Sequence, residues 1–108
     1  MSNLAQRPPL GQKSPKPDRG TSAGKAHMAR VAGLGCILCG YSAASVHHCI
    51  SGRYGSRKAS DFDTIPLCHL HHQGADGIHT DKARWEAMWG PDTDYLPIVA
   101  RLLNDRPL

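Results

Sequence analysis

Cysteine and histidine are concentrated in two short stretches of this chain. The first holds Cys36 and Cys39, with two residues between them, and the second holds Cys68 and His71 at the same spacing. A structural zinc ion needs four sulfur or nitrogen ligands in a closed tetrahedron, and two such pairs supply them without straining the backbone. The spacing therefore predicts one structural zinc bound by these four side chains.

Further histidines lie close to these ligands in the sequence: His47, His48, His72 and His79. A closed zinc site does not need them, so they predict a second metal site with an open coordination position, where a reaction could take place. Cys49 is the remaining thiol. It could replace His71 as a zinc ligand, lie buried as a small hydrophobic residue, or be incidental, and burial is favoured. A nucleophilic Cys–His pair is disfavoured because the thiols already fit zinc spacing.

Two disulfides are the alternative use of four cysteines. Residues 1–30 are polar and proline-rich, and they contain no apolar stretch of the length that an export signal or a membrane span requires. We therefore expect a cytoplasmic protein without a membrane partner. In that reducing compartment the cysteine spacing favours metal over disulfides.

The positive charge belongs to the N-terminal segment. The chain has a net charge of +4, but residues 1–30 carry six basic side chains against Asp18 alone, a net +5 that leaves −1 for the other 78 residues. Residues 1–23 are also rich in Pro, Gly, Ser and Lys, so little apolar burial offsets the entropy lost on ordering them. We expect a disordered basic tail over 1–23, which would bind DNA or RNA through counterion release. A solvated leader without a partner is the alternative.

The domain that follows, residues 24–108, must position the ligands. Residues 44–50 predict a strand that carries the adjacent pair of histidines, and residues 61–67 predict a returning strand with Pro66 at its end. Residues 68–72 then open a helical turn. This order is a hairpin followed by a helix, with ligands on the first strand and on the helix.

Helices are predicted on both sides of this unit, over residues 24–34, 81–89 and 91–105, with Thr80 as the N-cap of the second. Apolar residues at helical spacing predict the buried faces of the last two: Trp85, Met88 and Trp89, then Leu96, Val99, Leu102 and Leu103. The prediction is a small α+β domain stapled by zinc, with flanking helices.

A histidine pair on a strand, an acid in a returning segment that ends in Leu-Cys, and histidines on the next helix together resemble the ββα-metal core of the HNH endonucleases. The run over residues 60–72, with Gly77-Ile-His79 and Trp85-Glu86, more closely resembles the Ref-like, RecA-dependent nucleases of bacteriophages. The likeness covers residues 30–100. It implies a metal-dependent DNA endonuclease in the bacterial host cytoplasm, with DNA and a RecA-type recombinase filament as partners.

The resemblance also assigns roles to the histidines. His48 would be the general base that takes a proton from water, which suits an imidazole because its ordinary pKa lies near neutrality. His47 and His72 would bind the catalytic metal, and His79 would be a further ligand or a phosphate contact. Strand alternation puts His47 and His48 on opposite faces unless a twist or bulge turns one of them. The metal could be magnesium, manganese or zinc.

Asp63 lies five residues before Cys68 and matches the middle position of the HNH pattern, where the commonest residue is Asn. A carboxylate there could orient His48 or join the metal shell, and a turn-capping role is the alternative. Asp61 is the weaker candidate for the same role.

Basic residues between the two strands are candidate nucleic-acid contacts: Arg53, Arg57 and Lys58. They could clamp flanking phosphates, and a solvated loop is the alternative. A zinc-stabilised DNA-binding module without catalysis is the main rival to the nuclease, and an adaptor for a recombinase is a third interpretation. Neither rival explains the histidines that the structural zinc leaves over.

Overall fold

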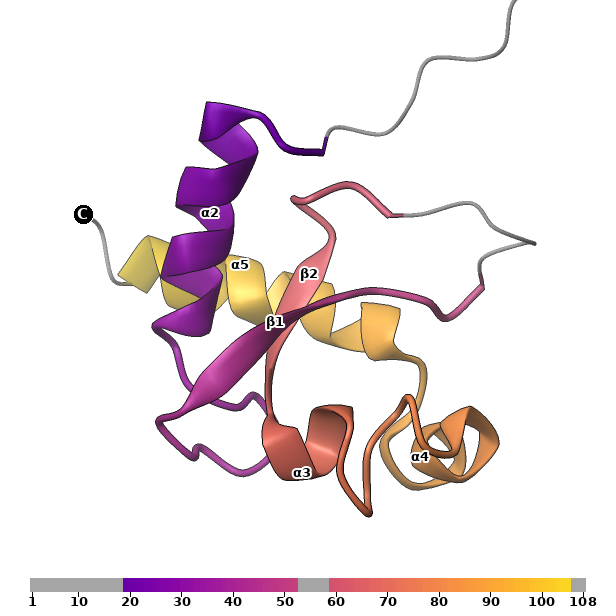
Figure 1. The fold of residues 1–108 in the computed structure, drawn as a ribbon. Coiled ribbons are helices and arrows are strands. Elements are labelled where there is room, and N and C mark those ends of the chain that lie inside the picture. The colour runs from indigo at the N-terminus through magenta and orange to yellow at the C-terminus, as the bar shows by residue number, and fades with distance from the viewer. Residues whose placement is uncertain (1–18, 53–58, 106–108) are drawn as a thin grey trace, which may run out of the picture.

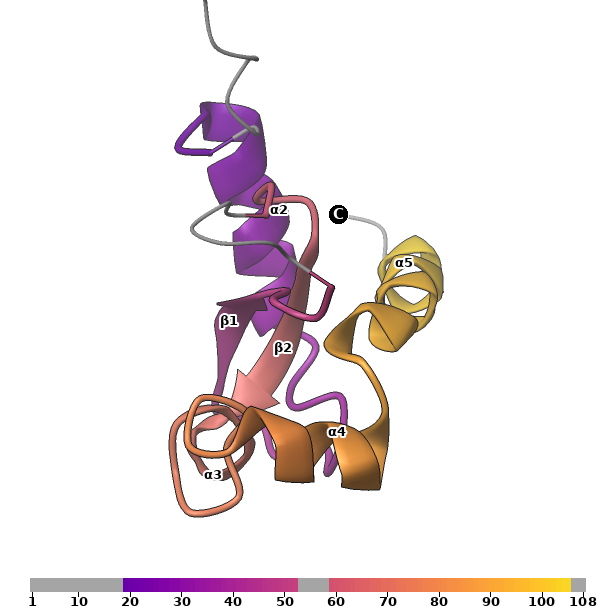
Figure 2. The same cartoon turned by 90° about the vertical axis from the view of Figure 1, so that its right-hand side faces the viewer.

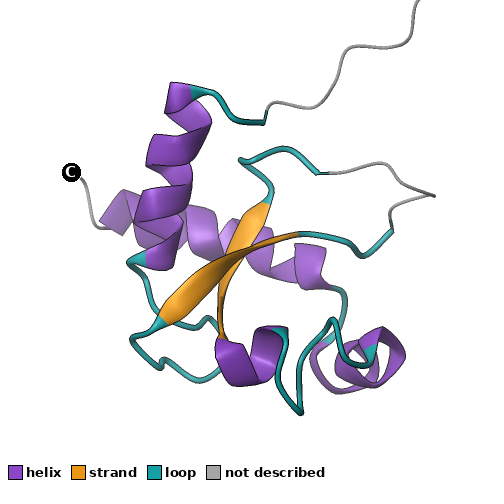
Figure 3. Cartoon of the chain, viewed as in Figure 1, coloured by secondary structure: helices purple, strands orange, loops and turns teal. Residues whose placement is uncertain are grey.

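A two-stranded antiparallel sheet surrounded by helices makes up the described part of the chain, residues 19–52 and 59–105 of a computed structural model (Figures 1 and 3). The elements follow in the order α2 (Ser22–Ala32), β1 (Ala44–His48), β2 (Thr64–Cys68), α3 (His69–His72), α4 (Lys82–Trp89), the 3-10 helix η1 (Asp92–Tyr95) and α5 (Leu96–Asp105). The predicted α+β class is confirmed. No helix within these residues is long and apolar enough to cross a membrane.

The hairpin pairs Ala44 with Cys68 and His48 with Thr64. Pro66 lies in the middle of β2, opposite Val46, and not at the strand end as predicted. Its carbonyl oxygen accepts the Ile37 N–H at 2.9 Å, away from β1. The ring nitrogen faces the same way, so the proline removes no hydrogen bond between the strands. A two-stranded sheet has only edge strands, where proline is tolerated.

Helices enclose the hairpin on several sides. Helix α5 lies behind it in Figure 1 and at the right in Figure 2, while α3 follows directly at the end of β2. The buried apolar residues form one core: Val31, Cys36, Cys49, Ile65, Leu67, Cys68, Ile78, Trp85, Val99 and Leu103. The core therefore includes three of the four thiols, and metal ligands and apolar packing share one small interior.

Helix α2 begins two residues earlier than predicted. Thr21 caps it, since the Thr21 hydroxyl accepts the Gly24 N–H at 2.9 Å, and Ser22 is the first helical residue. Residues 19–23, which the sequence assigns to the tail, therefore belong to the folded domain. The predicted tail otherwise falls on residues 1–18, outside the described residues.

The predicted starts of the last two helices are wrong. Asp81, and not Thr80, caps α4, because its carboxylate accepts the Arg84 N–H at 3.0 Å. The predicted helix over residues 91–105 is divided into η1 and α5. Met88, which the helical spacing predicts to be buried, is 62% exposed, so only part of the predicted apolar face of α4 packs on the core.

Candidate metal centres

Four side chains converge as the cysteine spacing predicts. The ligand atoms of Cys36, Cys39, Cys68 and His71 all lie within 4.8 Å of one another. Cys68 Sγ is 3.3 Å from His71 Nδ1 and Cys39 Sγ is 3.8 Å from Cys68 Sγ. Three thiols and one imidazole form a standard structural zinc shell, so this group can hold a zinc ion.

Local backbone geometry sets up the first ligand pair. Cys36 follows Gly35, whose φ of +82° favours glycine, and the turn closes when the Gly40 N–H donates to the Cys36 carbonyl at 2.8 Å. Burial alone would raise the pKa of the Cys36 thiol, but hydrogen bonds from backbone N–H groups and from His71 lower it to about 6. A lowered thiol pKa favours the thiolate, which is the form that binds metal.

Cys49 does not belong to this group. It is 3% exposed within the core, which confirms the prediction of burial. All four cysteines are thiols in the structure, with no disulfide among them.

A second group contains His47, His72 and His79, whose ligand nitrogens also lie within 4.8 Å of one another. The three ring centroids form a nearly equilateral triangle, with sides of 5.0, 5.1 and 4.9 Å. They come from β1, from α3 and from the loop after α3. Three imidazoles whose ligand nitrogens converge, with no fourth ligand among residues 19–52 and 59–105, are typical of a metal site that keeps one position open.

The loop after α3 folds back to deliver His79. The Ile78 and His79 N–H groups donate to the carbonyls of His71 and His72, each at 3.1 Å. Gly77 makes this return possible, because a Cβ there would lie 2.6 Å from the His72 carbonyl oxygen. Helix α3 ends at His72, so His79 lies on this returning loop and not on the helix.

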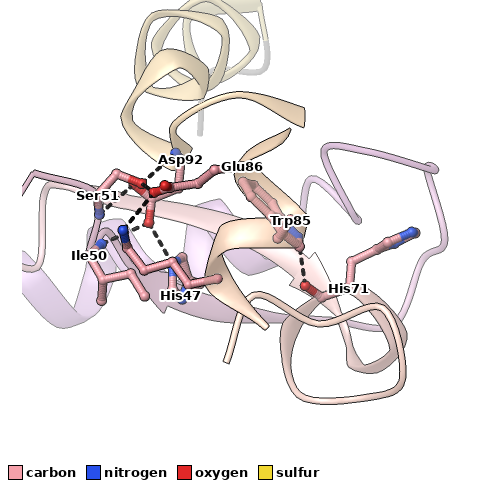
Figure 4. Close-up of polar contacts among 8 residues, drawn as sticks. His47, Ile50, Ser51, His71, Trp85, Glu86 and Asp92 are labelled. Carbon is pink, nitrogen blue, oxygen red and sulfur yellow. Dashed lines mark hydrogen bonds and ion pairs between the residues drawn. The ribbon is translucent and has the colours of Figure 1, made fainter. Parts of the chain in front are cut away.

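His47 is bound through one ring nitrogen only. Its Nε2 donates to Asp92 Oδ2 at 2.8 Å, and both side chains are fully buried (Figure 4). Within residues 19–52 and 59–105, His47 Nδ1 is the one buried side-chain nitrogen or oxygen without a hydrogen-bond partner. In the neutral ring with its proton on Nε2, Nδ1 carries a lone pair. A buried acceptor left unpaired costs about 1–3 kcal/mol, and a bound metal would remove that cost.

Asp92 is a residue of the candidate site that the sequence interpretation missed. Besides His47, its carboxylate accepts the N–H groups of Ile50 at 2.7 Å and Ser51 at 3.1 Å. Burial raises the pKa of Asp92, but these hydrogen bonds outweigh it and hold the pKa at about 2. The Ser51 hydroxyl accepts the Asp92 N–H and donates to Glu86 at 2.5 Å, as Figure 4 shows. The only sequence signal was an acid directly after Gly90-Pro91.

His72 could bind a metal in a similar way. Its Nδ1 lies 2.9 Å from the Ser45 hydroxyl, which leaves Nε2 for the group. Burial, and then the nearby His47, His79 and His69, lower the pKa of His72 to about 4. The ring is therefore neutral at pH 7, as a ligand must be.

His48 lies outside the three-histidine group. Its Nε2 donates to Asp61 Oδ1 at 2.8 Å, and its side chain is 24% exposed. The expectation that Asp63 orients His48 is therefore corrected to Asp61. Asp63 is exposed and contributes its backbone instead, with its carbonyl accepting the Cys49 N–H at 3.0 Å. Hydrogen bonds from His48 and from the Gly20 N–H lower the pKa of Asp61.

A solvent-open depression of about 390 Å³ lies beside His72, lined by Ala43, Ala44, Ser45, His69, His72 and Gln73. It gives His72 an open approach from solvent. The basic residues predicted to contact nucleic acid lie outside the described residues: Arg53, Arg57 and Lys58.

Replacing Asp92 by Asn should weaken metal binding at the three-histidine group by about 10–100-fold. The amide is neutral, so it no longer favours the Nε2–H tautomer of His47. Calorimetric titration of zinc-loaded protein with Mn²⁺ measures the effect, and zinc at the Cys3His group should stay at one equivalent. Asp94→Asn, two residues along and exposed, is the matched control. Equal affinity in wild type and Asp92→Asn would contradict the role given to Asp92.

Comparison with known proteins identifies one matching family. Residues 6–106 match the family model described as "Protein of unknown function (DUF968)". No curated protein and no solved structure matches the chain.

Proposed function

Since the chain belongs to the DUF968 family, whose description gives no function, we propose its function from the site: an HNH-type, metal-dependent DNA endonuclease. The hairpin β1–β2 followed directly by α3 supports this interpretation, because it has the order of a ββα-metal unit. Metal ligands on the first strand and on the helix support it further.

His47 carries the proposal. Its imidazole is buried, a buried carboxylate fixes its tautomer, and its Nδ1 lacks a hydrogen-bond partner. A structural domain, or one that only binds DNA, gains nothing from such an unpaired nitrogen. Two further histidines converge on the same point. This is the arrangement that an open metal site needs.

A divalent ion at this group would stabilise negative charge on the phosphate and on the leaving 3′ oxygen. Asp92 keeps His47 in the ligand tautomer, and burial keeps His72 neutral. His48 is the last residue of β1, and its partly exposed ring could take the proton from the attacking water. The depression beside His72 would let a phosphate approach that side chain from solvent. The Ref-like resemblance adds a recombinase filament as the proposed partner.

Incubation of zinc-loaded protein with single- and double-stranded DNA tests the proposal. Reactions should include Mg²⁺, Mn²⁺ or Zn²⁺, with and without a recombinase filament. We expect cleavage that requires a divalent ion and stops with a chelator, and none from a His72→Ala preparation purified in parallel. DNA binding without cleavage of any substrate would replace the nuclease by the zinc-stabilised binding module.

The basic N-terminal segment should contribute to DNA affinity. Removal of residues 1–18 should weaken binding and flatten the plot of log affinity against log salt, by about 0.9 for each phosphate that the shortened protein no longer neutralises. Replacement of Arg7, Lys13 and Lys16 by Ala should have the same effect if charge is the cause. An unchanged slope would show that this segment does not bind DNA.

A further inference from the structure

Asp61 lies where the loop before β2 meets the start of helix α2, and it is 2% exposed. Its two oxygens have different partners, since Oδ1 accepts from His48 Nε2 at 2.8 Å and Oδ2 accepts the Gly20 N–H at 2.7 Å. Arg19 Nε is 4.0 Å from Oδ1. A carboxylate held at both oxygens has one orientation, so it also fixes the ring that bonds to it.

Two glycines allow the chain before and within α2 to contact this carboxylate. Gly20 has a φ of +78°, a conformation that other residues rarely adopt. A Cβ at Gly24 would lie 2.7 Å from Asp61 Oδ2 and 3.0 Å from Asp61 Cβ. The first turn of α2 therefore packs directly on the Asp61 side chain, and any larger residue at position 24 would displace one of them.

We propose that Asp61, held by the segment that leads into helix α2, is the residue that positions His48 for proton transfer. With Nε2–H donating to Asp61, the neutral ring has its lone pair on Nδ1. Proton transfer then occurs at one defined atom, Nδ1, of a ring with one orientation. The inference rests on the proposed nuclease function and adds to it a positioning residue and a role for the N-terminal segment.

Asp61→Asn is the main test, because an amide can turn its NH2 toward His48 and favour the opposite tautomer. We expect kcat to fall by about 100-fold or more at nearly unchanged KM. The same substitution in a His48→Ala background should cause little further loss, because Asp61 acts through His48. Asp63→Asn should cost less than Asp61→Asn, and the reverse order would overturn the proposal.

A measurement that does not need activity accompanies these rates. Long-range ¹⁵N–¹H NMR of the zinc-loaded protein reports which ring nitrogen of His48 carries the proton. We expect Nε2–H in the wild type and a shift toward Nδ1–H in Asp61→Asn. An unchanged tautomer together with a wild-type kcat in Asp61→Asn would overturn the proposal.

Glycine substitutions test the role of the N-terminal segment. Gly24→Ala should lower kcat because the new methyl group meets the Asp61 carboxylate, although alanine ordinarily favours a helix. Gly33→Ala is the matched control, since a Cβ at Gly33 would make only ordinary contacts at 3.5 and 3.6 Å. A wild-type kcat in Gly24→Ala would overturn the assignment to this segment.

The nuclease function and the positioning role of Asp61 would fail differently. Absence of cleavage by the wild type would refute the proposed function, and the NMR measurement would still decide whether Asp61 sets the His48 tautomer. Cleavage by the wild type at an equal rate in Asp61→Asn would refute only the positioning role.

Discussion

Replacing Cys36 or Cys68 by Ser is expected to unfold the domain. Both residues belong to the apolar core as well as to the four-ligand group, so the change removes a zinc ligand from a buried position. Structural zinc supplies about 10–16 kcal/mol of apparent binding free energy in small zinc domains. Whole domains are stable by only about 5–15 kcal/mol. Thermal melting by circular dichroism, with zinc content measured by mass spectrometry, should show loss of both the transition and the ion.

Cys49→Ser provides the control, because Cys49 is equally buried but lies outside the group. That variant should keep one tightly bound zinc and a cooperative transition. Full zinc content and an unchanged melting temperature in Cys36→Ser or Cys68→Ser would show that these residues do not bind a structural ion.

The cysteine group could be predicted from sequence because its information is local. Two ligand pairs, each with a fixed spacing, need only one long-range contact to meet, and the hairpin provides it. The same holds for the order strand, strand, helix, which follows from short patterns of apolar residues and turns. The convergence of His47, His72 and His79 depended on the resemblance, and the structure shows the backbone contacts that cause it.

Carboxylate partners could not be predicted in this way. Asp92 is 45 residues from His47 in the chain, and their contact depends on how η1 packs against the end of β1. Asp61 and Asp63 lie two residues apart, and a turn decides which of them reaches His48. In that turn the Asp63 N–H bonds to the Ser60 carbonyl, and the Thr64 hydroxyl bonds to the Asp61 carbonyl. The glycines at positions 20 and 24 were the local sign that the start of α2 lies close to that loop.

His48→Ala and His72→Ala should both abolish cleavage, and they should do so for different reasons. Loss of a general base lowers a rate by about two to four orders of magnitude. His48 lies outside the three-histidine group, so His48→Ala should keep its affinity for Mn²⁺, its structural zinc and its DNA affinity. His72→Ala removes a ligand and should lose the second metal as well as the rate.

Single-turnover cleavage and calorimetric Mn²⁺ titration on each zinc-loaded variant separate the two effects. His27→Ala is the control, because this histidine of α2 belongs to neither group. Its ring lies tilted against that of Phe62, with 4.9 Å between the ring centroids. Its rate and Mn²⁺ affinity should match those of the wild type. A wild-type cleavage rate in His48→Ala would remove His48 as the base and make His79, at the three-histidine group, the next residue to substitute. Undiminished Mn²⁺ binding in His72→Ala would instead contradict the second metal site.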